Sequence, residues 1–239
     1  MPLYRITRTT HLCRCDGQLI LLDLKRERYV ALNVEEAAAL APFVQGWPVG
    51  SHSVHDSSAT GESGQRLLVS LLERRLLTKD PAGGKHATPP PFAKATRVLV
   101  LATERMYCRI RISHVLAFLS AAVAAKIMLR FIPLRHIVAY VGWRKRRSVA
   151  RRPVWHGSRI DELVGIFFRL RPFAFSGRDA CLLRSLALVE FLARHRVYPD
   201  WVFAVQSVPF GAHSWVQYQG VALNDYVRRI REFTPILVV

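Results

Sequence analysis

A proline- and glycine-rich segment near residue 85 divides the chain into two parts. Pro81-Ala82-Gly83-Gly84 is followed closely by Pro89-Pro90-Pro91. Glycines loosen a chain and a proline run stiffens it, so this composition is typical of a linker. We therefore expect two domains, residues 1–80 and 97–239, joined by a linker over residues 81–96. With 239 residues, of which 51% are hydrophobic, the chain is expected to be globular.

The first 80 residues alternate apolar and polar side chains and then change to a helical period. Asp16-Gly17 is a strong hairpin signal, and Asn33 with Glu36 three residues later forms a capping box before a helix. A second helix is predicted over residues 62–77, because its leucines form an apolar stripe. We predict strands over Leu3–Thr7, His11–Cys15, Gln18–Leu24 and Tyr29–Leu32. Such a small sheet can bind a peptide as an added edge strand; the alternative is a subdomain that only stabilises the protein.

The positive charge lies in the second part of the chain. Residues 1–80 contain 10 lysines and arginines and 9 acidic residues, whereas residues 81–239 contain 25 and 8. The densest basic run extends from Arg144 to Arg152, and it could attract nucleic acid, anionic lipid, an acidic peptide or nucleotide phosphates. A solvated surface face is the simpler interpretation. No zinc-finger, basic-zipper or RNA-recognition signature accompanies the run, so we expect no nucleic-acid partner.

Residues 110–132 form a long apolar helical stretch that is interrupted by Lys126 and Arg130. Its uninterrupted part is shorter than the roughly 20 residues that a bilayer-spanning helix needs. We therefore expect a buried or groove-lining helix, with membrane-surface contact as a less favoured alternative. The amino terminus has no apolar segment of the signal-peptide type, which favours a cytoplasmic protein.

The cysteines at positions 13, 15, 108 and 181 have no CxxC spacing. Cys13 and Cys15 are too close along one strand to form a disulfide easily. The sequence therefore predicts neither a zinc site nor a disulfide framework, and it favours a reducing cytosol. We expect no metal and no cofactor.

Three residues in the last quarter of the chain have the chemistry of a nucleophile, a base and an orienting carboxylate. Cys181 begins a long apolar helical run, His213 lies in an alternating strand, and Asp225 ends the next short strand. Gln219-Gly220 is a credible tight turn that would fold the strand of His213 back toward Asp225. A thiol at a helix start, with histidine and aspartate on neighbouring strands, is the arrangement that cysteine nucleophiles need.

The segment before the helix of Cys181 also favours a thiolate. Ser176 is a candidate N-cap and Asp179 would complete a variant capping box. Cys181 then falls in the first turn, where the helix dipole favours an anion. Asp179 opposes a thiolate, whereas Arg178 and Arg184 favour it. A buried structural cysteine, a structural histidine and a turn-forming aspartate remain the alternative interpretation of the three residues.

The stretch from Asp179 to Asp225 resembles the transglutaminase-like cysteine protease domain of lasso peptide B proteins. The segment from Phe210 to Val216, Phe-x-x-His-Ser-Trp-Val, is the most specific part of the resemblance. It implies that Cys181, His213 and Asp225 form the protease triad. Residues 1–80 resemble, by pattern, the precursor-peptide recognition element that is fused to the protease in some B proteins. The middle of the chain, residues 97–171, matches only loosely.

The resemblance implies an α+β protein with a small winged-helix-like N-terminal recognition domain and a C-terminal papain- or transglutaminase-like protease domain. Its function would be leader removal in the maturation of a ribosomally made lasso peptide. The implied partners are the precursor's leader segment and an asparagine-synthetase-like cyclase that consumes ATP. Some members of the family are described as needing ATP for proteolysis as well, although this sequence contains no P-loop. A transglutaminase-like acyl transferase and a non-catalytic peptide chaperone are the two alternative functions.

Overall fold

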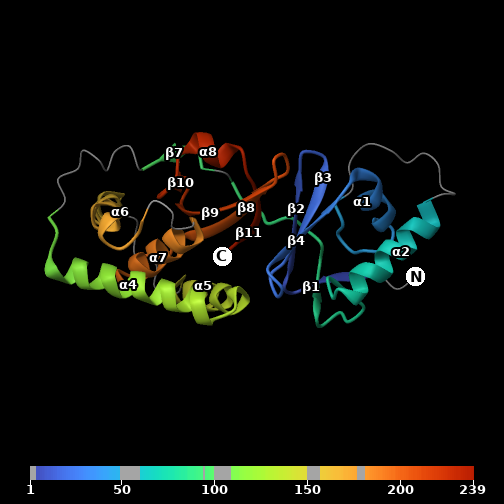
Figure 1. The fold of residues 1–239 in the computed structure, drawn as a ribbon, viewed down its shortest axis with the longest axis horizontal. Coiled ribbons are helices and arrows are strands. Elements are labelled where there is room, and N and C mark those ends of the chain that lie inside the picture. The colour runs from blue at the N-terminus through green and yellow to red at the C-terminus, as the bar shows by residue number, and fades with distance from the viewer. Residues whose placement is uncertain (1–3, 49–59, 94, 100–108, 150–156, 177–180) are drawn as a thin grey trace. The chain divides into compact units, whose positions relative to one another are not determined.

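The computed structural model describes residues 4–48, 60–93, 95–99, 109–149, 157–176 and 181–239 (Figure 1). The chain divides into two compact units. The first consists of Met1–Pro91, Val205–Gly211 and Thr234–Leu237, and the second of Phe92–Ala204, Ala212–Phe233 and Val238–Val239. Each unit is described by itself below.

The first unit contains the strands that the alternating pattern predicts. They are β1 (Arg5–Thr7), β2 (Thr10–Cys15), β3 (Gln18–Asp23) and β4 (Arg28–Leu32). Strands β2, β3 and β4 form an antiparallel sheet in that order (Figure 1). Asp16 and Gly17 connect β2 to β3 with φ angles of 48° and 81°, as a tight hairpin turn requires. The predicted strand limits are correct to within two residues.

Two helices of the first unit have ends that local chemistry explains. Helix α1 (Val34–Leu40) has the predicted capping box, in which Asn33 and Glu36 each accept the backbone N–H of the other. Helix α2 (Thr60–Glu73) ends four residues before the predicted Leu77. Arg75 has a φ of 58°, and the N–H groups of Arg75 and Leu76 return to the carbonyls of Leu72 and Leu71. This Schellman geometry stops the helix although the leucine pattern continues.

Part of the predicted linker is structured in the first unit. Strand β6 (Gly84–Lys85) pairs with β1, whose other edge pairs with β5 (Leu77–Thr78). Ala87 is fully buried in the core of this unit, together with leucines from β2, β3 and both helices. Residues 81–91, which the sequence assigned to a linker, therefore form a turn at Pro81–Gly83, strand β6 and a segment whose Ala87 is buried in the core of this unit.

A five-stranded sheet has the order β11-β8-β9-β10-β7, and β7, β10 and most of β8 and β9 belong to the second unit. The strands of this sheet are β7 (Arg97–Val98), β8 (Asp200–Gln206), β9 (Gly211–Tyr218), β10 (Val221–Ala222) and β11 (Thr234–Val238). Strand β10 pairs antiparallel with β9 and parallel with β7. Together with the helices of both units, this sheet makes the protein α+β, as the sequence predicts.

Helices supply the rest of the second unit (Figure 1). They are α4 (Ile112–Phe131), α5 (Leu134–Val149), α6 (Gly157–Leu170), α7 (Cys181–Arg194) and the short α8 (Val227–Arg231), with a 3₁₀ turn over Arg171–Phe173. Helix α4 packs on α7 and α6 through the buried Phe118, Ala121, Ala122 and Ala125. The prediction of a buried helix is therefore correct for only one face of α4, because large apolar side chains on the other face are exposed.

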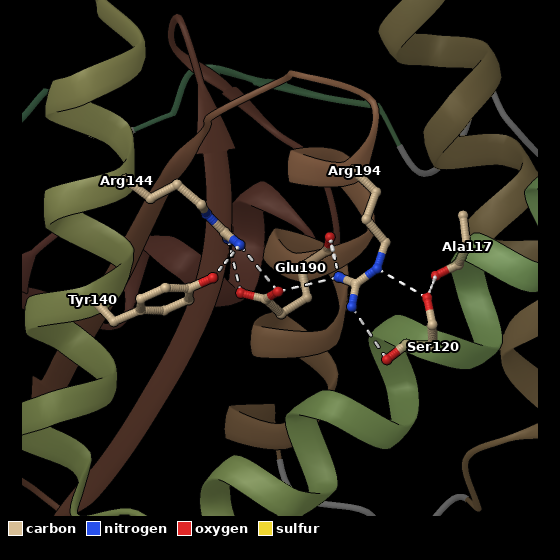
Figure 2. A network of polar contacts seen from close by, with 6 residues as sticks. All are labelled: Ala117, Ser120, Tyr140, Arg144, Glu190 and Arg194. Carbon is tan, nitrogen blue, oxygen red and sulfur yellow. Dashed lines mark hydrogen bonds and ion pairs between the residues drawn. The ribbon is translucent and has the colours of Figure 1, made fainter.

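A buried ion-pair network joins three of these helices (Figure 2). Glu190 on α7 accepts two hydrogen bonds from Arg144 on α5, at 2.8 and 3.0 Å, and another from Arg194 at 3.1 Å. Arg194 also donates to the hydroxyl and carbonyl oxygens of Ser120 on α4. Arg144 opens the basic run that the sequence assigned to a solvated face, and Lys145 pairs with Asp200. The beginning of that run is thus structural.

Candidate active site

Cys181 is the first described residue of α7, and residues 177–180, which precede it, lie outside the described part of the chain. A thiolate there benefits from the partial positive charge of the helix amino terminus. The side chain is partly exposed. Arg178 and Asp179 lie outside the described residues, as does most of the segment in which the capping box was predicted.

The β9–β10 hairpin places His213 and Asp225. His213 lies in β9, and Gln219 and Gly220 form the predicted tight turn with φ angles of 46° and 77°. The sequence predicted that the strand ends at Asp225, but β10 ends three residues earlier, at Ala222, so Asp225 lies in the bend that follows the strand. The bend turns the chain back along β9, and the Asp225 side chain reaches the imidazole.

His213 and Asp225 are both buried and in direct contact. Nε2 of His213 hydrogen-bonds Oδ2 of Asp225. The other carboxylate oxygen, Oδ1, accepts the backbone N–H of Tyr226 at 2.7 Å. Both oxygens of Asp225 are therefore engaged, which fixes the ring of His213 and leaves its other nitrogen, Nδ1, for the thiol. The ring also packs against Phe233 and Trp215, with centroid distances of 5.1 and 6.1 Å.

The contacts of Cys181 and His213 reverse the usual order of thiol and imidazole acidity. Burial raises the pKa of Cys181, but hydrogen bonds with His213 and Ser214 outweigh burial and lower the pKa from 9.0 to about 7. Burial lowers the pKa of His213, but hydrogen bonds with Asp225 and Cys181 raise it from 6.5 to about 9. The proton consequently moves from sulfur to nitrogen, and a thiolate–imidazolium pair forms between these two values.

A second set of contacts to the thiol was not expected from the sequence. Ser214 hydrogen-bonds Cys181 through its backbone and its side chain. The Ser214 hydroxyl lies 3.0 Å from that of Ser185, which accepts the indole N–H of Trp201 at 2.9 Å. Ser185 lies four residues after Cys181, so both residues occupy the same face of α7. This four-residue spacing could have indicated from the sequence that Ser185 lies near Cys181. It could not have identified the partners of Ser185, which are Trp201 on β8 and Ser214 on β9.

Asn224 holds the bend that carries Asp225. Its Oδ1 accepts the backbone N–H of Val216 at 2.7 Å, and the N–H of Leu223 donates to the carbonyl of Val216 at 2.9 Å. These bonds attach the segment before Asp225 to the middle of β9. Asn224 contacts the β9 backbone through its side chain and is a positioning residue.

The remaining described cysteines have a different environment. Cys13 and Cys15 are buried thiols in β2 of the first unit. Burial, and to a smaller extent the charge of the neighbouring Cys15 thiolate, raises the pKa of Cys13 to about 12. Cys108 lies outside the described residues. Within the described part of the chain, no group of three histidines, cysteines or carboxylates could hold a metal ion. The arrangement at Cys181 is suited to attack on a carbonyl carbon, in which an acyl group passes to sulfur.

The comparison with protein families agrees with this chemistry. The family model described as the transglutaminase-like superfamily matches residues 119–238, more than half of the chain. The match extends from α4 to β11 and includes Cys181, His213 and Asp225. No curated protein and no solved structure matches the chain.

Proposed function

Because this chain belongs to the transglutaminase-like superfamily, we propose that it is a cysteine protease that removes the leader segment of a lasso precursor peptide. The superfamily includes cysteine proteases and transglutaminases, so both hydrolysis and acyl transfer are within its chemistry. The finer assignment is supported by the resemblance of the Phe210–Val216 segment to lasso B proteins.

The observation that carries the proposal is the contact of three side chains. Cys181 at the start of α7 meets His213, whose other ring nitrogen meets the buried Asp225. A structural cysteine in an apolar core has a raised pKa, as Cys13 does. The pKa of Cys181 is instead lowered to about 7. This difference between two thiols of one chain is what favours a nucleophile.

In the proposed mechanism His213 holds the proton that Cys181 has lost. The sulfur attacks the carbonyl carbon of the scissile peptide bond, and His213 passes its proton to the leaving amine. His213 then takes a proton from water, whose oxygen attacks the thioester and releases the new carboxylate. Asp225 keeps the ring oriented and stabilises the imidazolium throughout. Backbone N–H groups at the start of α7, which lack partners inside a helix, would bind the oxyanion.

We assign recognition of the leader to the first unit, which we interpret as a winged-helix-like domain. Its sheet has the order β2-β3-β4, so β2 and β4 are edge strands of that sheet. Strand β4 is the more exposed of the two edges. A leader peptide in extended conformation could add to it through main-chain hydrogen bonds, with neighbouring side chains supplying specificity.

The proposal also names a setting. The protein would act in the cytoplasm, and the freed amine of the core peptide would pass to an asparagine-synthetase-like cyclase that consumes ATP. For the protease step we propose no metal and no cofactor. Any dependence of proteolysis on ATP would then belong to the complete maturation system.

The test uses the full chain and a synthetic peptide with the sequence of a precursor whose gene lies beside the gene of this protein. We expect wild-type protein to give leader and core fragments whose masses add up to the mass of the precursor plus one water. Cys181→Ala should abolish cleavage and keep precursor binding, and His213→Ala should be equally damaging because base and nucleophile act together. Asp225→Asn should reduce the rate by roughly 10²- to 10⁴-fold.

Cys13→Ala is the matched control, since it removes a thiol with a raised pKa, and it should cleave at nearly the wild-type rate. Cleavage by purified Cys181→Ala would refute the protease assignment. A product joined to an added amine, with no water incorporated, would instead identify an acyl transferase. Binding without any reaction in the wild-type protein would indicate a peptide chaperone.

A further inference from the structure

Helix α4 has two apolar faces, and only one of them is covered. Phe118, Ala121, Ala122 and Ala125 are buried against the second unit. The opposite face presents six large apolar side chains that are each between 45% and 80% exposed: Ile112, Leu116, Leu119, Val123, Ile127 and Phe131. Their spacing of three and four residues places them in one stripe along the whole helix. A continuous exposed stripe of this kind marks an interaction surface.

The charged residues of the segment that contains α4 and α5 are all basic. From Arg109 to Val149 the sequence contains nine lysines and arginines and no aspartate or glutamate. Arg109 and Arg111 precede α4, Arg130 is in its last turn, and Arg146 and Arg147 end α5. Among the described residues, none of these five arginines forms an ion pair with a carboxylate. The charge of this region is therefore available to an external anion.

Exposed aromatic rings accompany the arginines. The guanidinium of Arg130 lies 5.7 Å from the centroid of the Phe131 ring, and that of Arg147 lies 5.5 Å from the Trp143 ring. Trp143 stacks with Tyr140, and both rings are about half exposed. Tryptophan, tyrosine and arginine together are typical of side chains that lie at the level of lipid headgroups.

We propose that the second unit binds the surface of an anionic membrane through the exposed face of α4. The apolar stripe would enter the boundary between headgroups and acyl chains, and the arginines of α4 and α5 would contact lipid phosphates. The inference is independent of the proposed peptidase activity, since the contacts described above for Cys181, His213 and Asp225 are with one another and with Ser214, Trp215, Tyr226 and Phe233.

An orientation in the plane of the membrane fits the structure better than a crossing. By length and composition α4 could span a bilayer, and only 22% of its apolar stretch is buried in the protein. The helix is joined to the rest of the unit, however, by hydrogen bonds from Arg194 to Ser120 and from Lys126 to the carbonyl of Ala174. A helix that lies flat keeps these contacts, whereas a crossing helix would break them.

Two other occupants fit the surface less well. A second copy of the chain would place two sets of unpaired arginines against each other, which costs free energy. A nucleic acid would satisfy the arginines but leave the apolar stripe in water. An anionic bilayer satisfies both requirements at once.

The test measures binding of the full chain to phosphatidylcholine vesicles with and without about one third phosphatidylglycerol, by flotation. We expect binding to the anionic vesicles that weakens as salt rises. Val123→Glu places a charge at the centre of the stripe and should weaken binding about tenfold or more. The double variant Arg130→Gln with Arg147→Gln should weaken it roughly tenfold on anionic vesicles only.

Val69→Glu is the matched control, because Val69 on α2 is 52% exposed and Val123 is 54% exposed. It should bind vesicles as the wild type does, and circular dichroism should show that all variants are folded. Absence of vesicle binding by the wild type, or an equal loss in Val69→Glu, would overturn the proposal. So would a protein dimer that Val123→Glu dissociates in the absence of any vesicle binding. Peptide cleavage in solution should be unchanged in Val123→Glu.

Discussion

At the scale of single residues, the thiol and the imidazole of the candidate site exchange their usual acidities. The pKa of Cys181 is lowered to about 7 and that of His213 is raised to about 9. Below pH 7 the sulfur is protonated and unreactive. Above pH 9 the imidazolium loses the proton that a leaving amine needs. Between these values both groups are in the form that the proposed chemistry uses.

We predict that alkylation of Cys181 by iodoacetamide rises with pH through about 7, because only the thiolate reacts. The rate of modification at Cys181 would be followed by peptide mass mapping from pH 5 to 10, which needs no substrate. Peptide cleavage should follow a bell-shaped profile that rises near pH 7 and falls near pH 9.

Two variants measure separately how much His213 and Ser214 lower the pKa of Cys181. His213→Ala removes the hydrogen bond that contributes most to lowering the pKa of Cys181. The pH at which alkylation of Cys181 rises should therefore move up, toward the ordinary thiol range. Ser214→Ala removes a weaker contributor and should move the profile less in the same direction. An unchanged profile in His213→Ala would show that the imidazole does not activate the thiol.

At the scale of the helices, Glu190 joins α7 to α5 and, through Arg194, to α4 (Figure 2). The carboxylate is buried, and two guanidinium groups neutralise it. Removing one partner of a buried ion pair is strongly destabilising, since the remaining charges lose their compensation. The helix that begins with Cys181 therefore depends on a contact near its other end.

We predict that Glu190→Gln lowers the free energy of unfolding by about 3–5 kcal/mol, because Arg144 and Arg194 would remain partly buried beside a neutral amide. Urea unfolding of the full chain measures this change. Glu232→Gln is the control: Glu232 is exposed, and its replacement should change stability by less than about 0.5 kcal/mol. Equal effects of the two substitutions would contradict a structural role for the network.

At the scale of the whole molecule, the two units contain buried basic groups with opposite pKa shifts. In the first unit Nδ1 of His11 on β2 lies 3.1 Å from Nζ of Lys85 on β6. Burial, with the Lys85 charge as a smaller cause, lowers the pKa of His11 to about 3. Burial also lowers the pKa of Lys85 to about 8. In the second unit, the pKa of His213 is raised.

The first unit should consequently lose stability in acid. Between pH 6.5 and about 3 the unfolded chain binds a proton at His11 that the folded unit excludes, so the free energy of unfolding falls as pH falls. His213 has the opposite sign: its contribution is complete below pH 6.5 and is lost as pH rises through about 9. Acid therefore weakens the first unit through His11, and alkali weakens the second through His213.

We predict that His11→Gln reduces the loss of stability between pH 7.5 and pH 4.5, because glutamine can accept a hydrogen bond from Lys85 and does not titrate. Urea unfolding at both pH values measures the difference, and effects of carboxylates are common to both proteins. His86→Gln, at an exposed histidine close to Lys85 in sequence, should retain the wild-type dependence. The same loss in His11→Gln would contradict the assignment.

Local chemistry made much of the fold predictable. The Asp16-Gly17 turn, the Asn33–Glu36 capping box and the Gln219-Gly220 turn each depend on residues adjacent in the chain. His213 and Asp225 are twelve residues apart across one hairpin, so the turn alone brings them near each other.

The contacts between distant segments could be seen only in the tertiary structure. Strand β6, which lies in the predicted linker, pairs with β1 and belongs to a domain. Arg144, which lies in a run that the sequence assigned to a solvated face, forms an ion pair with Glu190. Helix α4 has apolar residues around its circumference, and packing against α7 selected which face is covered. Turns, caps and the order of the site residues could be predicted before the structure was known, because they depend on neighbours along the chain. Burial, pKa values and the exposed stripe depend on which surfaces meet, and periodicity within one element cannot specify that.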